Sequence, residues 1–253
     1  MQVNSRPLIL SIETATRAGS LALTRGRELL ASWVGDAGSS HSTHLLEEIE
    51  KMLEEARVTL SQVDAFAVAA GPGSFTGLRI GLATVKSFAA TLNRHCIGIP
   101  TLNAVALGAG ESGGTIALLP AGRGEVFAQR FAVSGECVVQ PFESPIHVRP
   151  DSLLDKIVSM RRLKWTGEGA QNYQEEIKAR AQAEGINFVT ADSKADVSDK
   201  DGWTLVRSTE ALAASVSRLA LARAPFDDTY TPQNLRAIYV RPSDAEINER
   251  CQA

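Results

Sequence analysis

The stretch from Ala65 to Gly81, AFAVAAGPGSFTGLRIG, constrains the fold of this 253-residue chain more than any other. Its first part, Ala65–Ala70, is a continuous apolar run of strand length, which is typical of a strand covered on both faces. Gly71-Pro72-Gly73 then ends the strand in a sharp turn, and Ser74 or Thr76 can cap a helix that runs to about Leu92. The pattern predicts a buried strand joined tightly to a helix, as in layered α/β domains.

Glycine-rich turns of this kind often bind phosphate, but two familiar versions do not fit this one. A P-loop reads G-x-x-x-x-G-K-[ST], whereas here Gly77 is followed by Leu78 and Arg79. The dinucleotide fingerprint needs a third glycine where this chain has Thr76. An anion site made by backbone amides at the start of the helix stays open as an alternative.

The glycines inside the helix indicate close packing. Gly77, Gly81, Thr84 and Phe88 share one side of it. A helix-interior Gly costs about 0.5 to 1 kcal/mol relative to Ala, so we expect a neighbouring helix to approach there. An opposite apolar stripe is expected to face the sheet, and it consists of Leu78, Leu82, Val85 and Ala89.

The residues before this stretch predict a hairpin-led domain. Leu8–Ile12 and Ser20–Leu23 form the expected hairpin, and a third strand is expected at Glu28–Val34. A helix from about His41 to Arg57 carries one apolar stripe and keeps its glutamates away from it. That stripe contains Leu45, Leu46, Ile49, Met52, Leu53 and Ala56. With a further buried strand at Cys96–Pro100, the order predicts a layered α/β domain with a mixed sheet.

A run of small residues at 108–114 is the expected boundary between two domains, 1–108 and 109–253. In the second domain we expect strands at 115–119, 125–133, 137–140 and 237–240, helices at 152–160, 173–184 and 208–223, and a polar loop at 192–202. Packing of helix 208–223 back on the first domain stays open.

Charge and cysteine content narrow the function class. A net charge of -3 and a pI near 5.9 argue against a chain that binds nucleic acid by itself. Cys96, Cys137 and Cys251 are scattered without a CxxC pair, which fits a reducing compartment. We find no signal peptide before Leu8 and no apolar run of membrane-spanning length, so we expect a cytoplasmic protein without membrane contact.

The run Asp64–Gly81 resembles the signature of the TsaB (YeaZ) family, which belongs to bacterial tRNA threonylcarbamoyladenosine (t6A) synthesis. Further segments similar to that family are Ile12–Thr16, His41-Ser42, Gly124–Phe127 and Tyr239–Glu246. The resemblance implies the actin-like ATPase and sugar kinase (ASKHA) superfold, an α/β fold with two lobes and mixed sheets. It also implies a non-catalytic partner of TsaD, the threonylcarbamoyltransferase that modifies adenosine 37 of tRNA, acting together with TsaE.

A scaffold subunit that binds TsaD is therefore the leading hypothesis, with helices 41–57 and 74–91 as the binding surface. The expected interface residues are Leu45, Leu46, Ile49, Leu53, Gly77, Gly81, Thr84 and Phe88. A homodimer through the same surface is an alternative when TsaD is absent, and tRNA is expected to be contacted only through the complex.

The chain departs from the family pattern at two places that bear on nucleotide binding. Glu13 stands where the family usually carries Asp, and Pro120–Arg123 replaces an Asp-Ala-Arg-Arg type of run. The candidate nucleotide-binding residues are Glu13, Thr14, Gly71 and Gly73. No tightly bound cofactor is expected, and ATP or ADP remains an option at the level of the complex.

An enzyme of the same superfold is the alternative, either an ATP-dependent small-molecule kinase or a metal-dependent, glycoprotease-like hydrolase. The resemblance implies that TsaD, the catalytic relative, holds its metal with an H-x-x-x-H pair just after the strand equivalent to Ile97–Pro100. At that place this chain has Thr101–Val105, which contain no histidine. His41 and His44 lack a third committed ligand, with Glu48 one turn beyond. We therefore predict no metal site and no catalytic residues.

Two further segments favour structural interpretations. Glu111–Thr115 imitates the D-x-G-G-T phosphate turn of kinases, but it follows small residues and is expected to be a linker loop. Arg161–Lys164 is expected to be a solvated basic cluster.

Overall fold

The computed structural model describes residues 6–36, 41–135, 137–192, 202–208 and 210–240. Several features named above lie outside the described residues. They are Cys251, most of the polar segment at 192–202, residues 241–246 of the last family segment, and the side chains of His41 and Ser42.

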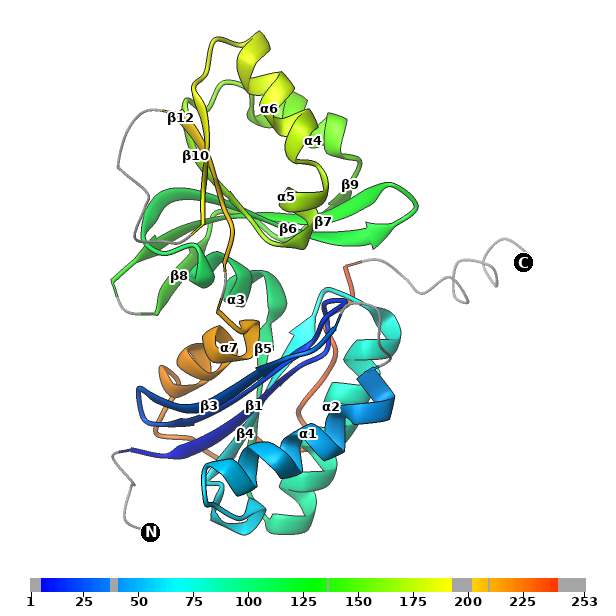
Figure 1. Ribbon diagram of the computed structural model, residues 1–253, viewed down its shortest axis with the longest axis vertical. Coiled ribbons are helices and arrows are strands. Elements are labelled where there is room, and N and C mark those ends of the chain that lie inside the picture. The colour runs from blue at the N-terminus through cyan, green and yellow to red at the C-terminus, as the bar shows by residue number, and fades with distance from the viewer. Residues whose placement is uncertain (1–5, 37–40, 136, 193–201, 209, 241–253) are drawn as a thin grey trace, which may run out of the picture.

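Two lobes, each built on its own β-sheet, make up the described chain (Figure 1). The strand order of the first sheet is β3-β2-β1-β4-β5. Its strands are β1 (Leu8–Glu13), β2 (Ser20–Arg25), β3 (Glu28–Val34), β4 (Ala65–Gly71) and β5 (His95–Pro100). The sheet is mixed, because β1 pairs antiparallel with β2 and parallel with β4. The expected hairpin, third strand and buried central strand are confirmed.

Helices cover both faces of the first sheet (Figure 1). Helices α1 (His41–Glu55) and α2 (Phe75–Leu92) lie on one face, and a short 3-10 turn, η1 (Leu60–Gln62), leads from α1 to β4. Helix α7 (Leu212–Leu221) comes from far along the sequence and packs on the other face, against β1 and β2. A hydrogen bond of 2.5 Å between Thr24 Oγ1 and Ser217 Oγ joins α7 to β2 inside this packing.

The second sheet has the order β11-β12-β10-β6-β7-β8, with β9 paired to β7. Its strands are β6 (Ser112–Gly122), β7 (Glu125–Ser134), β8 (Val138–Pro141), β9 (Ile146–Val148), β10 (Arg162–Thr166), β11 (Phe188–Ala191) and β12 (Gly202–Val206). Its helices are α4 (Pro150–Ile157), α5 (Glu168–Asn172) and α6 (Gln174–Ala183). The core is centred on Trp165 and Trp203, whose ring centroids lie 5.1 Å apart on neighbouring strands.

Helix α3 (Thr101–Gly108) lies between the lobes, in contact with α7 and with β6. The sequence interpretation missed this helix, because a run of small apolar residues without a capping side chain carries no helix signal. The prediction of a linker loop at Glu111–Thr115 is also wrong, except at Glu111. Strand β6 begins at Ser112 and pairs with β7.

Two other local predictions need comment. In the basic cluster Arg161–Lys164, the two arginines are exposed as expected, but residues 162–164 belong to β10 and Leu163 is buried in the second core. The expected strand at 237–240 does not form. That segment instead gives one hydrogen bond to the sheet, from Ile238 N to Ala70 O at 2.7 Å. Of the helices in the described part of the chain, none combines the length and apolarity of a membrane span.

Candidate functional site

The glycine-rich turn after β4 is filled by the chain's own backbone. A Cβ added at Gly71, which has a φ of +118°, would lie 2.3 Å from Ile238 O. A Cβ added at Gly73 would lie 2.6 Å from Ala15 O, and Ser74 N donates to the same oxygen at 2.8 Å. These two glycines therefore serve the close approach of other backbone segments.

The start of α2 is capped as the sequence predicts, because Ser74 Oγ accepts a hydrogen bond from Gly77 N at 3.2 Å. The expectation that a helix approaches Gly77 and Gly81 is wrong. A Cβ at Gly77 would lie 1.8 Å from Thr14 O, and one at Gly81 would lie 2.4 Å from Thr14 Oγ1. Thr14 Oγ1 also donates to Gly77 O at 2.7 Å. The glycines let α2 rest on the residue that follows β1, so both are covered within this chain.

The other expected interface residues divide between the core and the surface. Leu45, Ile49 and Leu53 are buried under α1, since less than a tenth of each is exposed. Phe88 is half-buried with its ring 5.6 Å from that of Phe66, and Thr84 is half-buried as well. Leu46 is 62% exposed and is therefore the most accessible member of the predicted set.

Beyond its first turn, the side of α2 that faces solvent is made mostly of small residues. We call the small exposed residues Thr76, Ala83, Ser87, Ala90 and Thr91 the outer face of α2. The first turn also exposes Phe75 and Arg79, and the Arg79 guanidinium lies 3.9 Å from the centroid of the Phe75 ring. Sequence reasoning missed the outer face, because a helical pattern shows which residues share a stripe but not which stripe the fold covers. The available signal was the spacing of small residues at 83, 87 and 90, on the side away from Gly77 and Gly81.

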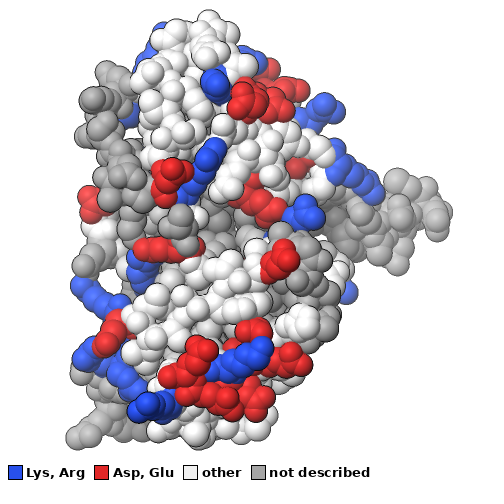
Figure 2. Space-filling view, in the orientation of Figure 1, with Lys and Arg blue, Asp and Glu red and all other residues white. Residues whose placement is uncertain are grey.

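The solvent side of α1, next to the outer face of α2, is acidic. Figure 2 shows a group of acidic side chains over α1 with a single basic one among them. The exposed acids are Glu47, Glu50, Glu54 and Glu55, and Lys51 pairs with Glu48 at 2.7 Å. A small-residue helix face therefore lies beside a negatively charged one.

Of the four candidate nucleotide-binding residues, only Glu13 lines the cavity between the lobes that we call the interlobe cleft, about 350 Å³ in volume. Its carboxylate accepts from Thr16 N at 2.7 Å, Thr16 Oγ1 at 2.9 Å and Ser20 Oγ at 3.1 Å. Burial raises the pKa of Glu13, and these hydrogen bonds oppose the shift. Ser20 Oγ in turn accepts from Ala213 N at 3.0 Å. Glu13 thus holds the β1–β2 turn and, through Ser20, the start of α7.

The ASKHA fold class implies a nucleotide, but these residues do not fit a phosphate. Both Glu13 oxygens already accept hydrogen bonds, Thr14 is bonded to α2, and backbone fills the positions beside Gly71 and Gly73. The other charged residues that line the cleft are Arg17, Glu168 and Glu210. Since acidic side chains outnumber basic ones there, the described cleft is poorly suited to a polyphosphate.

The described residues contain no group of three or more His, Cys, Asp or Glu side chains that could hold a metal ion. His44 Nδ1 lies 3.5 Å from Glu47 Oε2, and His147 Nε2 lies 2.8 Å from Glu125 Oε2. Pro120–Arg123 forms the end of β6 and the turn into β7.

The two-lobed architecture places the chain in the ASKHA class, as the sequence predicts. It is similar to the structure of YeaZ from Pseudomonas aeruginosa, with a TM-score of 0.68 and 22% identity, over 92% of this chain and 99% of that one. A second structure, described as similar to peptidase YeaZ from the same organism, gives a TM-score of 0.69 over 93% of this chain and 100% of that one, also at 22% identity. At this identity the similarity establishes the fold.

Residues 35–229 match the family model described as TsaD, tRNA N6-adenosine threonylcarbamoyltransferase, and the chain belongs to this family. It is 34% identical over 122 residues to the Escherichia coli tRNA threonylcarbamoyladenosine biosynthesis protein TsaB, covering 47% of this chain and 52% of that protein. The Haemophilus influenzae protein of the same name is 36% identical over 104 residues, 41% of this chain and 43% of its own length. An uncharacterized Mycobacterium tuberculosis protein is 32% identical over 125 residues, 49% of this chain and 58% of its own length. The chain thus spans about half the length of the curated relatives it matches, and the expected similarity to TsaB is confirmed.

Proposed function

We propose that this chain takes part in forming t6A at position 37 of tRNA as a supporting subunit that binds the TsaD transferase. The family match and the relatives named TsaB support the pathway. The observation that most favours a supporting role is the outer face of α2, a solvent-facing helix surface of small residues beside the acidic surface of α1.

The physical argument for docking rests on shape and charge. Small side chains such as Ala83, Ser87 and Ala90 let the backbone of a second helix come close, at the short end of the 8–10 Å between packed helix axes. The glutamates of α1 favour a partner whose facing surface is basic, and such complementarity speeds association and fixes orientation. We therefore expect a helix of TsaD to lie on the outer face of α2, with lysines or arginines opposite α1.

A non-catalytic role is supported by two places in the chain: the segment where TsaD is expected to carry its metal-binding histidines, and Glu13. Helix α3 occupies the place, just after β5, where TsaD is expected to carry its histidine pair, and α3 contains no histidine. The Glu13 carboxylate is engaged by Thr16 and Ser20. ATP hydrolysis by the isolated chain that disappears in Glu13→Ala would contradict this part of the proposal.

We extend the proposal to the location of the chain and to its further partners. In this proposal the chain is cytoplasmic and holds no tightly bound cofactor, and tRNA and any ATP or ADP are bound by the complex with TsaD and TsaE. Without TsaD, the outer face of α2 supports a homodimer. Sedimentation of the purified chain would then show a dimer that Ser87→Arg converts to a monomer.

The proposal is tested by co-purification with TsaD from the same organism. Ser87→Arg places a long cation on the outer face of α2, and we expect the affinity for TsaD to fall at least tenfold. Ser152→Arg is the matched control, because Ser152 is also exposed on a helix, α4, but belongs to the other lobe. Equal recovery of TsaD with wild type and Ser87→Arg, both folded by circular dichroism, would refute the proposed surface.

A further inference from the structure

Two exposed aromatic rings and one guanidinium lie together at the start of α2, and we call this group, made of Phe75, Tyr239 and Arg79, the aromatic cluster. The ring centroids of Phe75 and Tyr239 lie 5.7 Å apart, and the Arg79 guanidinium lies 3.9 Å from the centroid of the Phe75 ring. We propose that the aromatic cluster binds a carboxylate of the partner protein that docks on the outer face of α2. This inference rests on the proposed function and deepens it, because it names the chemistry of the partner at one point.

The position of the aromatic cluster makes it continuous with the outer face of α2. Arg79 lies three residues after Thr76 and four before Ala83, so the three side chains share one side of the helix. The distance from Arg79 to Ala83 along the helix axis is about 6 Å. The segment that carries Tyr239 is held beside this helix start by the hydrogen bond from Ile238 N to β4 at 2.7 Å. A helix that lies on Ala83 therefore comes within reach of the aromatic cluster.

Arg79 is prepared to bind an anion. In the part of the chain that the structure describes, its side chain forms no hydrogen bond and no ion pair, and its guanidinium lies over the Phe75 ring. The cation–π attraction restrains the guanidinium without supplying a hydrogen-bond acceptor, so its N–H donors still need one. A carboxylate meets that need through two parallel hydrogen bonds. Because the side chain is already restrained, binding costs less conformational entropy.

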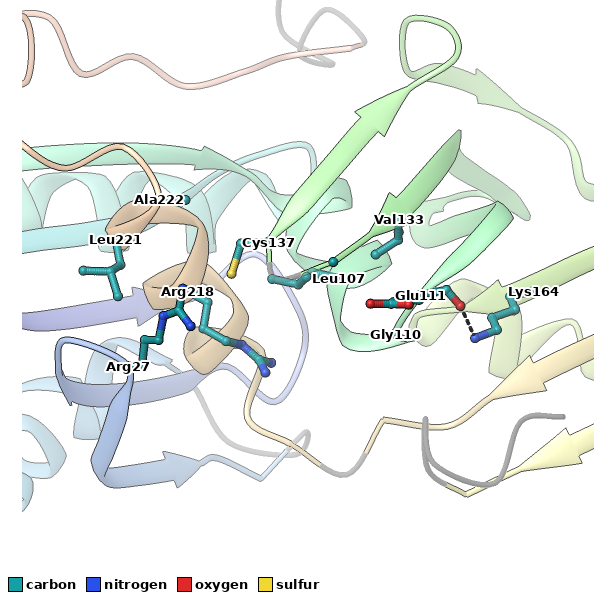
Figure 3. A pocket seen from close by; sticks show the side chains of 11 residues that line it. Arg27, Leu107, Gly110, Glu111, Val133, Cys137, Lys164, Arg218, Leu221 and Ala222 are labelled. Carbon is teal, nitrogen blue, oxygen red and sulfur yellow. Dashed lines mark hydrogen bonds between the residues drawn. The ribbon is translucent and has the colours of Figure 1, made fainter. Parts of the chain in front are cut away.

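The cations of the hollow between the lobes, shown in Figure 3, differ from Arg79. Lys164 Nζ donates to the backbone oxygen of Glu111 at 2.6 Å (Figure 3), and Arg218 pairs with Glu210 at 2.7 Å. These two side chains are engaged within the chain, so they offer a partner less than Arg79 does.

The charges around the aromatic cluster favour a protein carboxylate over a nucleic-acid phosphate. The exposed glutamates of α1 lie beside the outer face of α2, and the whole chain has a net charge of -3 (Figure 2). A nucleic acid would bring a phosphate at every nucleotide onto this acidic side. A protein can place one acidic side chain at Arg79 and basic side chains opposite α1, which fixes its orientation. Arg and Tyr are also enriched among the residues that dominate the affinity of protein interfaces.

The test is a calorimetric measurement of Kd between the full chain and TsaD from the same organism, with substitutions of Arg79. We expect Arg79→Gln to weaken binding about tenfold through loss of the charge-assisted pair, and Arg79→Glu about a hundredfold through added repulsion. Arg79→Lys keeps the charge without the planar fork, so its Kd should lie between those of wild type and Arg79→Gln. Arg149→Glu is the matched control, because it makes the same charge change at an exposed arginine of the other lobe, and its Kd should equal that of wild type.

The outcomes separate this inference from the proposed function. If wild type binds TsaD and Arg79→Glu binds equally well, the inference is overturned and the proposed function stands; if wild type does not bind TsaD, both fail. A gel shift of tRNA by the isolated chain that disappears in Arg79→Glu would assign the aromatic cluster to RNA and overturn the carboxylate. Each variant is checked for folding by circular dichroism, and Arg79→Gln decides the outcome if Arg79→Glu does not fold.

Discussion

Substitution of Gly77 by Ala tests the close contact between α2 and Thr14. The new Cβ would lie 1.8 Å from Thr14 O, so the backbone there must move by about 1.5 Å to reach a normal contact distance. Overpacking of this kind costs about 1–3 kcal/mol, and loss of the hydrogen bond from Thr14 Oγ1 to Gly77 O adds about 1 kcal/mol. The better helix propensity of Ala offsets about 0.5–1 kcal/mol. We expect a net loss of about 1–3.5 kcal/mol in the free energy of unfolding.

The assay is urea unfolding of wild type and variant followed by circular dichroism, with thermal unfolding as a second measurement. The expected loss corresponds to a Tm lower by about 2–14 °C for a protein of this size. Gly113→Ala is the matched control, because Gly113 is exposed and a Cβ there would meet no atom within 4 Å. We expect the control to stay within about 0.5 kcal/mol of wild type. Equal stability of Gly77→Ala and Gly113→Ala would refute the packing of α2 on Thr14.

Three further predictions concern buried groups. Burial raises the pKa of Glu13 above its ordinary 4.5. The stability that the Glu13 side chain contributes is therefore present below pH 4.5 and is lost as the pH rises through the folded pKa. Urea unfolding at a series of pH values should show this loss of stability in wild type and not in Glu13→Gln. Thr14→Val should lower the free energy of unfolding by about 1–2 kcal/mol, since it leaves Gly77 O without its side-chain donor, and a value within 0.3 kcal/mol of wild type would count against that bond. Burial raises the pKa of the Cys96 thiol to about 11, so iodoacetamide at pH 8 should leave Cys96 unmodified in the folded protein and alkylate it in urea, as peptide mass mapping would show.

The regular elements of the first lobe follow from local sequence signals. The apolar run Ala65–Ala70 predicts the buried strand β4, and Ser74 predicts the start of α2, because burial and capping each depend on residue types at fixed spacing. Helix α3 and strand β10 were not recognised. The first contains small residues without a cap, and in the second the basic residues conceal the alternation of Leu163 and Trp165.

The candidate surface was predicted only in part, for a different physical reason. Helical spacing correctly grouped Gly77 with Gly81, but the groups that approach them belong to Thr14, whose place depends on the parallel pairing of β1 with β4. Such a contact between residues more than 60 positions apart has no local signature. The exposed face of α2 can be identified only once the face that the fold covers is known.

The central claim is that this chain supports t6A formation through the outer face of α2. It is tested most directly by mass spectrometry of tRNA nucleosides from cells of the source organism that are depleted of the chain and then supplied with wild type, Ser87→Arg or Ser152→Arg. The account predicts that depletion removes t6A, that wild type and Ser152→Arg restore it, and that Ser87→Arg does not. Retention of t6A after depletion, or full restoration by Ser87→Arg, would contradict it.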